Sequence, residues 1–157
     1  MTRFSHLDQA KKQNVDIHEG IESSLKILHS QLKNRIEIHK EYKAAKTVEC
    51  NPGQINQVLL NILSNAAQSI NNEGNIWIDT GEENDYLFVK IKDDGGGIKK
   101  EDLERIFDPF FTTKAIGEGT GLGLSISYSI IKNHNGTIET ESEVNKGSSF
   151  TILLPLN

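Results

Sequence analysis

The chain has 157 residues, 36% of them hydrophobic and 25% charged, and a net charge of −5 at pH 7. This length corresponds to about one domain with a real hydrophobic core, and the acidic balance argues against nucleic-acid binding through a broad basic surface. The sequence has neither an apolar run of about 20 residues, as a membrane span needs, nor a signal segment after Met1. Cys50 is the only cysteine, so we expect a cytoplasmic domain in which Cys50 is structural.

The amino-terminal half predicts two helices and one strand. Residues 1–12 are polar, and residues 1–15 are interpreted as a linker or the tail of a preceding helix. Asp16 and Glu19 have the pattern of a capping box, which predicts a helix start. Residues 35–42 alternate as a strand does. Asn51 and Pro52 predict a second helix start. The apolar positions of the first helix are Ile17, Ile21, Leu25, Leu28 and Leu32, and those of the second are Ile55, Val58, Leu59, Ile62, Leu63, Ala66 and Ile70.

The remaining elements complete a sheet. We predict strands at 76–80 and 86–93 joined by a turn at 81–85, and two closing strands at 137–143 and 148–154. Between the two pairs lie a short helix at 101–107, a long loop at 108–120 and a helix at 120–132 capped near Gly136. The sequence therefore predicts an α+β fold, a two-layer sandwich in which about three helices cover one face of a mixed sheet.

The helix predicted after Pro52 has an unusual polar face. From Gln54 to Ile70 it contains no charged residue, and amides share one stripe at spacings of three and four. Asparagine costs roughly half a kcal/mol in mid-helix relative to alanine. Amide oxygens suit a hard cation such as Mg²⁺, which prefers oxygen ligands; the alternative is a plain polar face. The stripe consists of Gln57, Asn61, Asn65 and Gln68.

A second candidate cluster follows the strand predicted at 86–93. Alternation places Asp93 on the same face as the apolar residues Leu87 and Ile91, where an unpaired charge is costly. A ligand amino group would be a suitable partner, and Gly95 and Gly97 would let the backbone approach a flat ring. The alternative is a strand that ends in a polar turn.

A third cluster is glycine-rich and precedes the helix predicted at 120–132. Glycines at a helix entrance leave backbone N–H groups bare, and such groups at the positive end of a helix bind phosphate; the alternative is a flexible turn. The preceding loop contains Phe110 and Phe111, which indicate a lid, a partner surface or a local hydrophobic plug. Lys114 in that loop is a candidate contact for a terminal phosphate.

These motifs resemble those of the sensor histidine kinases, in the same order. The match covers about residues 16–155 and implies the Bergerat-type ATP-binding α/β sandwich, which gyrase-type topoisomerases, mismatch-repair ATPases and a major chaperone class share. Asn61–Ala66 resembles the N box, Asp93–Gly97 the first glycine box, Phe107–Phe111 the F box, Gly119–Leu124 the second glycine box and Gly147–Phe150 the final glycine box.

The resemblance implies a role for each matching residue. Asp93 would bond the adenine amino group, Asn65 would hold Mg²⁺ and Asn61 would assist near the phosphates, with Lys114 in the lid. Asn61 and Lys114 are then the catalytic candidates. The nucleotide-binding candidates are Asn61, Asn65, Asp93, Gly95, Gly97, Ile98, Lys114, Gly119, Thr120, Gly121, Leu122, Gly123 and Leu124.

One substitution within the N box bears on the reaction. Relatives that hydrolyse ATP carry a glutamate general base four residues before the magnesium asparagine, and Asn61 at that position cannot take a proton. This favours a phosphoryl donor over an ATPase. The family's phosphoacceptor histidine motif does not occur, so we expect no autophosphorylation by this chain alone. Gln68 and the segment 109–114 resemble the nitrogen-regulator-like branch.

We therefore expect a catalytic ATP-binding domain at 16–157, preceded at 1–15 by a remnant of a dimerisation helix or linker. It would bind Mg²⁺-ATP and donate the γ-phosphoryl group to a histidine on a separate dimerisation domain, and so act indirectly on a response regulator. The domain is expected to be monomeric in isolation, without membrane or nucleic-acid contact. The alternatives are a stand-alone ATPase and a nucleotide-sensing switch module of the same fold.

Overall fold

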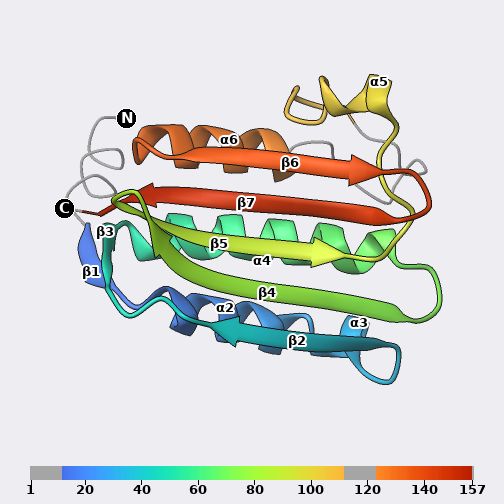
Figure 1. Cartoon of the computed structure of the whole chain (residues 1–157), viewed down its shortest axis with the longest axis horizontal. Coiled ribbons are helices and arrows are strands. Elements are labelled where there is room, and N and C mark those ends of the chain that lie inside the picture. Colours follow the sequence, from blue (N-terminus) through green and yellow to red (C-terminus); the bar gives the residue numbers. More distant parts are fainter. Residues whose placement is uncertain (1–11, 112–122, 157) are drawn as a thin grey trace.

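The computed structural model describes residues 12–111 and 123–156, and there one five-stranded mixed sheet is covered on one face by helices (Figure 1). β2 (Ile36–Tyr42) runs parallel to β4 (Gly74–Glu83), and every other neighbouring pair of this sheet is antiparallel. The predicted α+β sandwich is confirmed. The strand order is β2 (Ile36–Tyr42), β4 (Gly74–Glu83), β5 (Tyr86–Asp93), β7 (Gly147–Pro155) and β6 (Thr137–Glu143).

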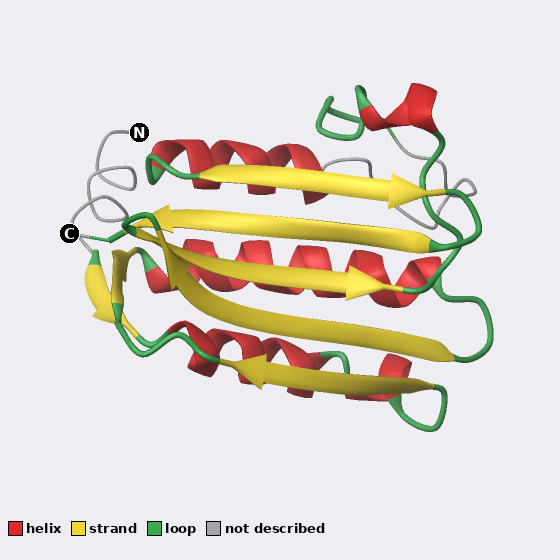
Figure 2. Ribbon diagram, viewed as in Figure 1, coloured by secondary structure: helices red, strands yellow, loops and turns green. Residues whose placement is uncertain are grey.

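Helices of the described residues form the second layer (Figure 2). They are α2 (Ile17–Ile27), α4 (Pro52–Ser69) and α6 (Gly123–Asn133), and α4 contacts both of the others. The first helix is shorter than predicted, because the chain leaves the helix at Leu28 and resumes as α3 (His29–Leu32). This break lets Leu28 and Leu32 both enter the core. The short helix predicted at 101–107 is also shorter, since α5 spans only Lys100–Leu103.

The core lies between α4 and the sheet. All seven apolar positions predicted for this helix are buried, and each fully buried aliphatic side chain contributes about 1.5–3 kcal/mol. This packing fixes the rotation of α4 and therefore the direction of its amide stripe. The sheet residues in the same cluster include Ile76, Ile78, Leu87, Val89, Ile91 and Ile152.

Residues distant in sequence fix both ends of α4. Asn51 caps the amino-terminal end as predicted, and its backbone N–H donates to Nε2 of His134 at 3.1 Å. At the other end the guanidinium of Arg35 donates to the carbonyl oxygens of Ala67 and Ile70, at 3.0 Å each. A cation at a helix carboxyl end satisfies carbonyls that lack partners within the helix. The helix is thereby anchored to α6 and to the start of β2.

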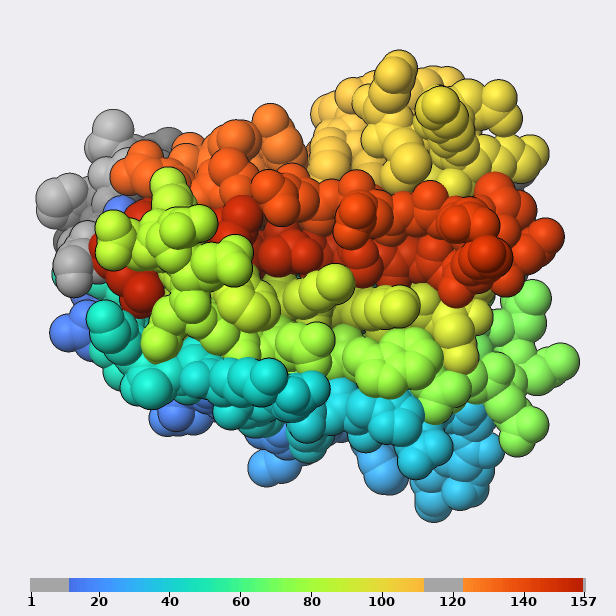
Figure 3. Space-filling view, in the orientation of Figure 1, coloured from blue at the N-terminus to red at the C-terminus, as the bar shows by residue number. Residues whose placement is uncertain are grey.

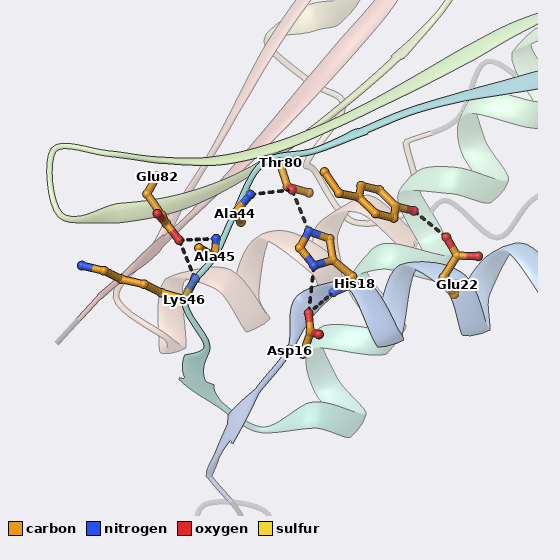
Figure 4. Close-up of polar contacts among 9 residues, drawn as sticks. Asp16, His18, Glu22, Ala44, Ala45, Lys46, Thr80 and Glu82 are labelled. Carbon is orange, nitrogen blue, oxygen red and sulfur yellow. Dashed lines mark hydrogen bonds and ion pairs between the residues drawn. The ribbon is translucent and has the colours of Figure 1, made fainter.

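A polar cluster attaches α2 to strand β4 of the sheet (Figure 4). Asp16 caps α2, accepts from the backbone N–H of His18 at 3.0 Å and lies 2.9 Å from its Nδ1. The other ring nitrogen of His18 is 2.7 Å from the hydroxyl of Thr80 on β4. The Tyr42 ring stacks on His18, and its hydroxyl donates to Glu22 at 2.7 Å. The predicted helix start at Asp16 is confirmed.

Two short strands add a feature that the sequence pattern did not predict. β1 (Gln13–Val15) pairs antiparallel with β3 (Val48–Cys50). Cys50 is fully buried there, and burial raises the pKa of its thiol to about 11. The thiol therefore stays protonated at neutral pH, which supports the structural role predicted for Cys50.

Two turns differ from the prediction. The turn between β4 and β5 comprises only Asn84 and Asp85, with φ of 52° and 66°, a pair of left-handed residues that matches the twist of a two-residue hairpin. After α6 the left-handed residue is Asn135, at φ 61°, and not Gly136. Asparagine tolerates this conformation because its side chain bonds locally.

The opposite face of the sheet carries no helix in the described ranges, and Figure 3 looks onto it. The segment around α5 protrudes at one end of this view. On the open face the rings of His39 and Trp77 stack with centroids 5.4 Å apart, and Nζ of Lys92 lies 5.6 Å from the centroid of the Trp77 ring. Among the residues that the structure describes, no helix has both the length and the apolarity to span a bilayer.

Candidate functional site

Asp93 is the last residue of β5, and only 2% of its surface is exposed. It lies on the helix-facing side of the sheet, as the alternation of β5 predicted. One carboxylate oxygen accepts from the backbone N–H of Gly95 at 2.9 Å. The backbone N–H of Ser148 and the hydroxyl of Ser69 also lie close enough to the carboxylate to lower its pKa. The Ser69 hydroxyl donates to the carbonyl of Ala66 at 2.8 Å.

Opposing effects act on the pKa of the Asp93 carboxyl. Burial raises the pKa of its carboxyl above the ordinary value, and the carboxylate of Asp94 acts in the same direction. Hydrogen bonds from Gly95, Ser69 and Ser148 favour the ionised form. A carboxylate offers about four acceptor positions, so these donors leave capacity for a donor group of a ligand.

The loop that follows Asp93 is held by backbone hydrogen bonds. The N–H of Gly96 donates to the carbonyl of Ser69 at 3.1 Å, and its carbonyl accepts from Asn145 at 2.8 Å. The N–H of Ile98 donates to the hydroxyl of Ser142 at 2.7 Å. The loop is therefore fixed to α4 on one side and to the hairpin between β6 and β7 on the other.

Both predicted glycines of this loop are required by contacts with the protein itself. A Cβ at Gly95 would collide with the backbone and hydroxyl oxygens of Ser69. Gly97 has φ 76° and lies against the carbonyl of Glu143. A side chain at either position would push the loop away from Asp93, so the glycines also protect the position of the carboxylate.

The amide stripe leads along α4 toward Asp93. Its outer members, Gln57 and Gln68, are exposed, whereas Asn61 and Asn65 are half-buried. The side-chain NH₂ of Asn61 donates to the carbonyl of Gly123 at 3.2 Å and lies 3.3 Å from the hydroxyl of Ser127. These bonds join the middle of α4 to the start of α6 and leave the amide oxygen of Asn61 as the atom for a further contact.

Comparison with known proteins connects this geometry to a family. Residues 50–157 match the family described as histidine kinase-, DNA gyrase B- and HSP90-like ATPases. The nucleotide-free catalytic domain of the histidine kinase ThkA superposes with a TM-score of 0.82 at 33% identity, over 92% of this chain and 95% of that one. The chain belongs to this family. It is a histidine kinase catalytic domain, of the class that binds ATP.

Curated relatives are longer sensor kinases. ZraS of Escherichia coli K12 is 40% identical over 148 residues, which cover 92% of this chain and 31% of ZraS. AtoS of the same strain is 36% identical over 160 residues, covering 100% of this chain and 26% of AtoS. Sporulation kinase E of Bacillus subtilis is 36% identical over 157 residues, covering 99% and 20%. The chain thus spans less than a third of each, and ZraS and AtoS support the resemblance to the nitrogen-regulator-like branch.

Only some of the residues predicted to bind the phosphates lie in the part of the kinase domain that the structure describes. Gly123 and Leu124 form the start of α6 as described, and Gly123 faces Asn61. The predicted lid continues beyond residue 111. The predicted residues Lys114, Gly119, Thr120, Gly121 and Leu122 lie outside the described residues.

The F box of the kinase domain forms a small aromatic cluster beside α6. The Phe107 and Tyr128 rings lie 5.2 Å apart between centroids, and the Arg105 guanidinium lies 4.7 Å from the Phe111 ring. Phe110 is 72% exposed. Phe107 and Phe111 therefore pack locally, as the hydrophobic-plug interpretation expects, whereas Phe110 faces solvent and the lid and partner-surface interpretations stay predictions.

Three serines around Asp93 were not singled out from the sequence. Ser69 continues the amide stripe four residues after Asn65, a spacing that signals the same helix face. Ser148 and Ser142 lie on neighbouring strands, and the register around the β6–β7 turn places them opposite each other. Residue pairs counted outward from the turn between β6 and β7 place Ser142 opposite Ser148, and this count would have found both serines.

Proposed function

We propose that this domain binds Mg²⁺-ATP and donates the γ-phosphoryl group to a histidine on the dimerisation domain of its parent kinase. In this proposal Asp93 accepts from the adenine amino group, and Asn65 and Asn61 act at the phosphate end. The observation that carries the proposal is the buried Asp93 carboxylate at one end of the amide stripe of α4. A buried acceptor of this kind suits a ligand donor in a fixed position.

The residues present fit a magnesium ion held partly by its nucleotide. Mg²⁺ prefers oxygen ligands, keeps several waters and is usually bound through one or two protein groups plus substrate phosphates. The described ranges contain no cluster of three or more His, Cys, Asp or Glu residues that would hold a metal. The amide oxygens of Asn65 and Asn61 would therefore supply neutral ligands, and the phosphates would supply the charge.

Transfer in this proposal depends on positioning and not on an activated water. Asn61 cannot serve as a general base, and its NH₂ group is already donated to α6. Phosphoryl transfer needs mainly alignment and neutralisation of charge. The missing base disfavours hydrolysis as the main reaction.

The partners in this proposal are the histidine-bearing dimerisation domain and, after transfer, a response regulator, all in the cytoplasm where ATP is available. A solved structure of ThkA is a complex with the response regulator protein TrrA, and ThkA there superposes with a TM-score of 0.79 at 29% identity, over 93% of this chain and 42% of that one. That likeness supports a regulator as the final acceptor for the parent of this domain.

Calorimetric titration with the β,γ-imido analogue of ATP, with and without Mg²⁺, tests the proposal. We expect saturable binding to one site, tighter when Mg²⁺ is present. A protein that is folded by circular dichroism and still gives no binding heat or displacement of a fluorescent ATP analogue would refute it. Affinity unaffected by Mg²⁺ would refute the metal component.

A further inference from the structure

Ser142, Ser148 and Asp93 form one row across three neighbouring strands. Ser142 on β6 is directly opposite Ser148 on β7, and Ser148 is directly opposite Asp93 on β5. Side chains of directly opposite residues lie on the same face of the sheet, with Cβ atoms about 4.5–5.5 Å apart. The row therefore runs along the helix-facing side and ends at the carboxylate.

The hydroxyl of Ser142 has three hydrogen-bonding neighbours. It accepts from the N–H of Ile98 at 2.7 Å, lies 2.8 Å from the hydroxyl oxygen of Ser148 and lies 3.1 Å from the carbonyl oxygen of Gly147. A hydroxyl has one hydrogen and two lone pairs, and a carbonyl oxygen only accepts. One assignment satisfies all three neighbours: Ser142 donates to Gly147 and accepts from both Ile98 and Ser148.

This assignment determines what Ser148 offers to a ligand. With its hydrogen committed to Ser142, the Ser148 oxygen has only acceptor capacity left, and it lies beside a carboxylate that is also an acceptor. A surface made only of acceptors favours the amino group of adenine. It disfavours the carbonyl oxygen that guanine carries at the same ring position, because two acceptors then face each other.

We propose that Ser142 is a positioning residue for base selection, which acts through the orientation of the Ser148 hydroxyl and through the loop at Ile98. The inference rests on the proposed function, in which Asp93 accepts from the adenine amino group. Replacing Ser142 with alanine releases the Ser148 hydrogen, which can then turn toward the ligand and donate to the guanine carbonyl. The loop also loses its anchor at the N–H of Ile98.

The test measures dissociation constants for the β,γ-imido analogues of ATP and GTP, by competition with a fluorescent ATP analogue in Mg²⁺. In Ser142→Ala the ratio of the GTP-analogue constant to the ATP-analogue constant should fall by about three- to tenfold, the size of one neutral hydrogen bond. Ser142→Thr keeps the hydroxyl and should retain the ratio of the unmodified protein. Ser148→Ala should lower the ratio less than Ser142→Ala does, because this variant has no Ser148 hydrogen that could donate to the guanine carbonyl.

Thr140→Val is the matched control. Thr140 precedes Ser142 on the same face of β6, and its hydroxyl has no hydrogen-bond partner in the described structure. Thr140→Val should bind the ATP and GTP analogues with the affinities of the unmodified protein. The double variant Ser142→Ala/Ser148→Ala should have the same ratio as Ser148→Ala alone, because it has no Ser148 hydrogen to release.

The outcomes separate base selection from simple stability. The inference is wrong, and Ser142 has only a structural role, in either of two cases. In the first, Ser142→Ala weakens the binding of both analogues by the same factor. In the second, Thr140→Val lowers the ratio as much as Ser142→Ala does. A further fall of the ratio in the double variant would also overturn it. Thermal unfolding of each variant verifies that it is folded. If the unmodified protein binds neither analogue, or both equally, the proposed function itself fails before any variant is compared.

Discussion

Two adjacent aspartates at the end of β5 have opposite environments. Asp93 is buried, and burial raises the pKa of its carboxyl. Asp94 is exposed and accepts from the backbone N–H and side-chain amide of Asn75 at 2.7 and 3.0 Å. For Asp94 these bonds outweigh the effect of partial burial, so the pKa of its carboxyl lies below the ordinary value. The sequence Asp-Asp thus contains one candidate ligand acceptor and one structural acceptor.

This contrast provides a matched pair of substitutions. Asp93→Asn should weaken binding of the ATP analogue about ten- to a hundredfold, because a charge-assisted hydrogen bond of roughly 1.5–3 kcal/mol is lost and an amide can present a donor to the adenine amino group. Asp94→Asn, the control, should leave the affinity within about twofold. Calorimetry on both variants checks this. Equal affinity of the unmodified protein for ATP and GTP would contradict the role of Asp93.

Asn65 allows a test of the amide stripe at the level of a single side chain. Asn65→Ala should remove most of the Mg²⁺ dependence of triphosphate binding and change metal-free ADP binding little, while the helix persists because alanine is the better helix former. Gln68→Ala, which changes an exposed amide of the same stripe, should keep the dependence on Mg²⁺. Titrations with and without the metal measure both. If Mg²⁺ still tightens triphosphate binding equally in Asn65→Ala, the amide stripe is only a polar face and does not hold the metal.

At the scale of elements, one buried histidine supports the junction of α4 and α6 at the amino-terminal end of α4. His134 is 6% exposed, donates from Nδ1 to the carbonyl of Ile130 at 2.8 Å and accepts from Asn51 through Nε2. His134→Leu keeps most of the volume but removes the acceptor of the Asn51 N–H, and should lower the free energy of unfolding by about 1–3 kcal/mol. His29→Leu, at an exposed position, is the control. Urea denaturation compares them, and equal stabilities would show that the junction does not depend on this bond.

Local patterns predicted the elements well where one face of an element is buried. The apolar face of α4 and the alternation that places Asp93 inward depend on the helical and strand periods alone, and both are confirmed. The missed features depend on distant partners. Arg35 caps a helix that ends more than thirty residues later in the chain, and Ser142 gains its neighbours only through the register of β6 against β7. Periodicity within one segment carries no information about such pairs.

For the whole molecule, the site is assembled from segments that are far apart in the chain. Asp93 ends β5, Ser148 opposite it is the second residue of β7, and the amide stripe comes from α4. The sheet brings the first two together by strand pairing, and core packing directs the stripe toward them. Substitutions that loosen the α4 packing should therefore affect nucleotide binding and stability together. Substitutions on the open face, around Trp77, should affect neither site geometry nor base selection.

The last prediction concerns the domain acting as a separate protein. It should bind ATP yet take up no phosphoryl group, because the chain lacks the family's phosphoacceptor motif and Asn61 cannot activate water. Adding a separate dimerisation domain from the parent kinase, with its acceptor histidine, should restore weak transfer, since the high effective concentration of a tether is absent. Incubation with γ-labelled ATP and Mg²⁺ measures this, with Asp93→Asn as the inactive control. His6 is followed by Leu7 and Asp8 and lacks the rest of that motif. Acid-labile label on this chain alone, lost in His6→Ala, would contradict the prediction. Rapid phosphate release without label would favour an ATPase.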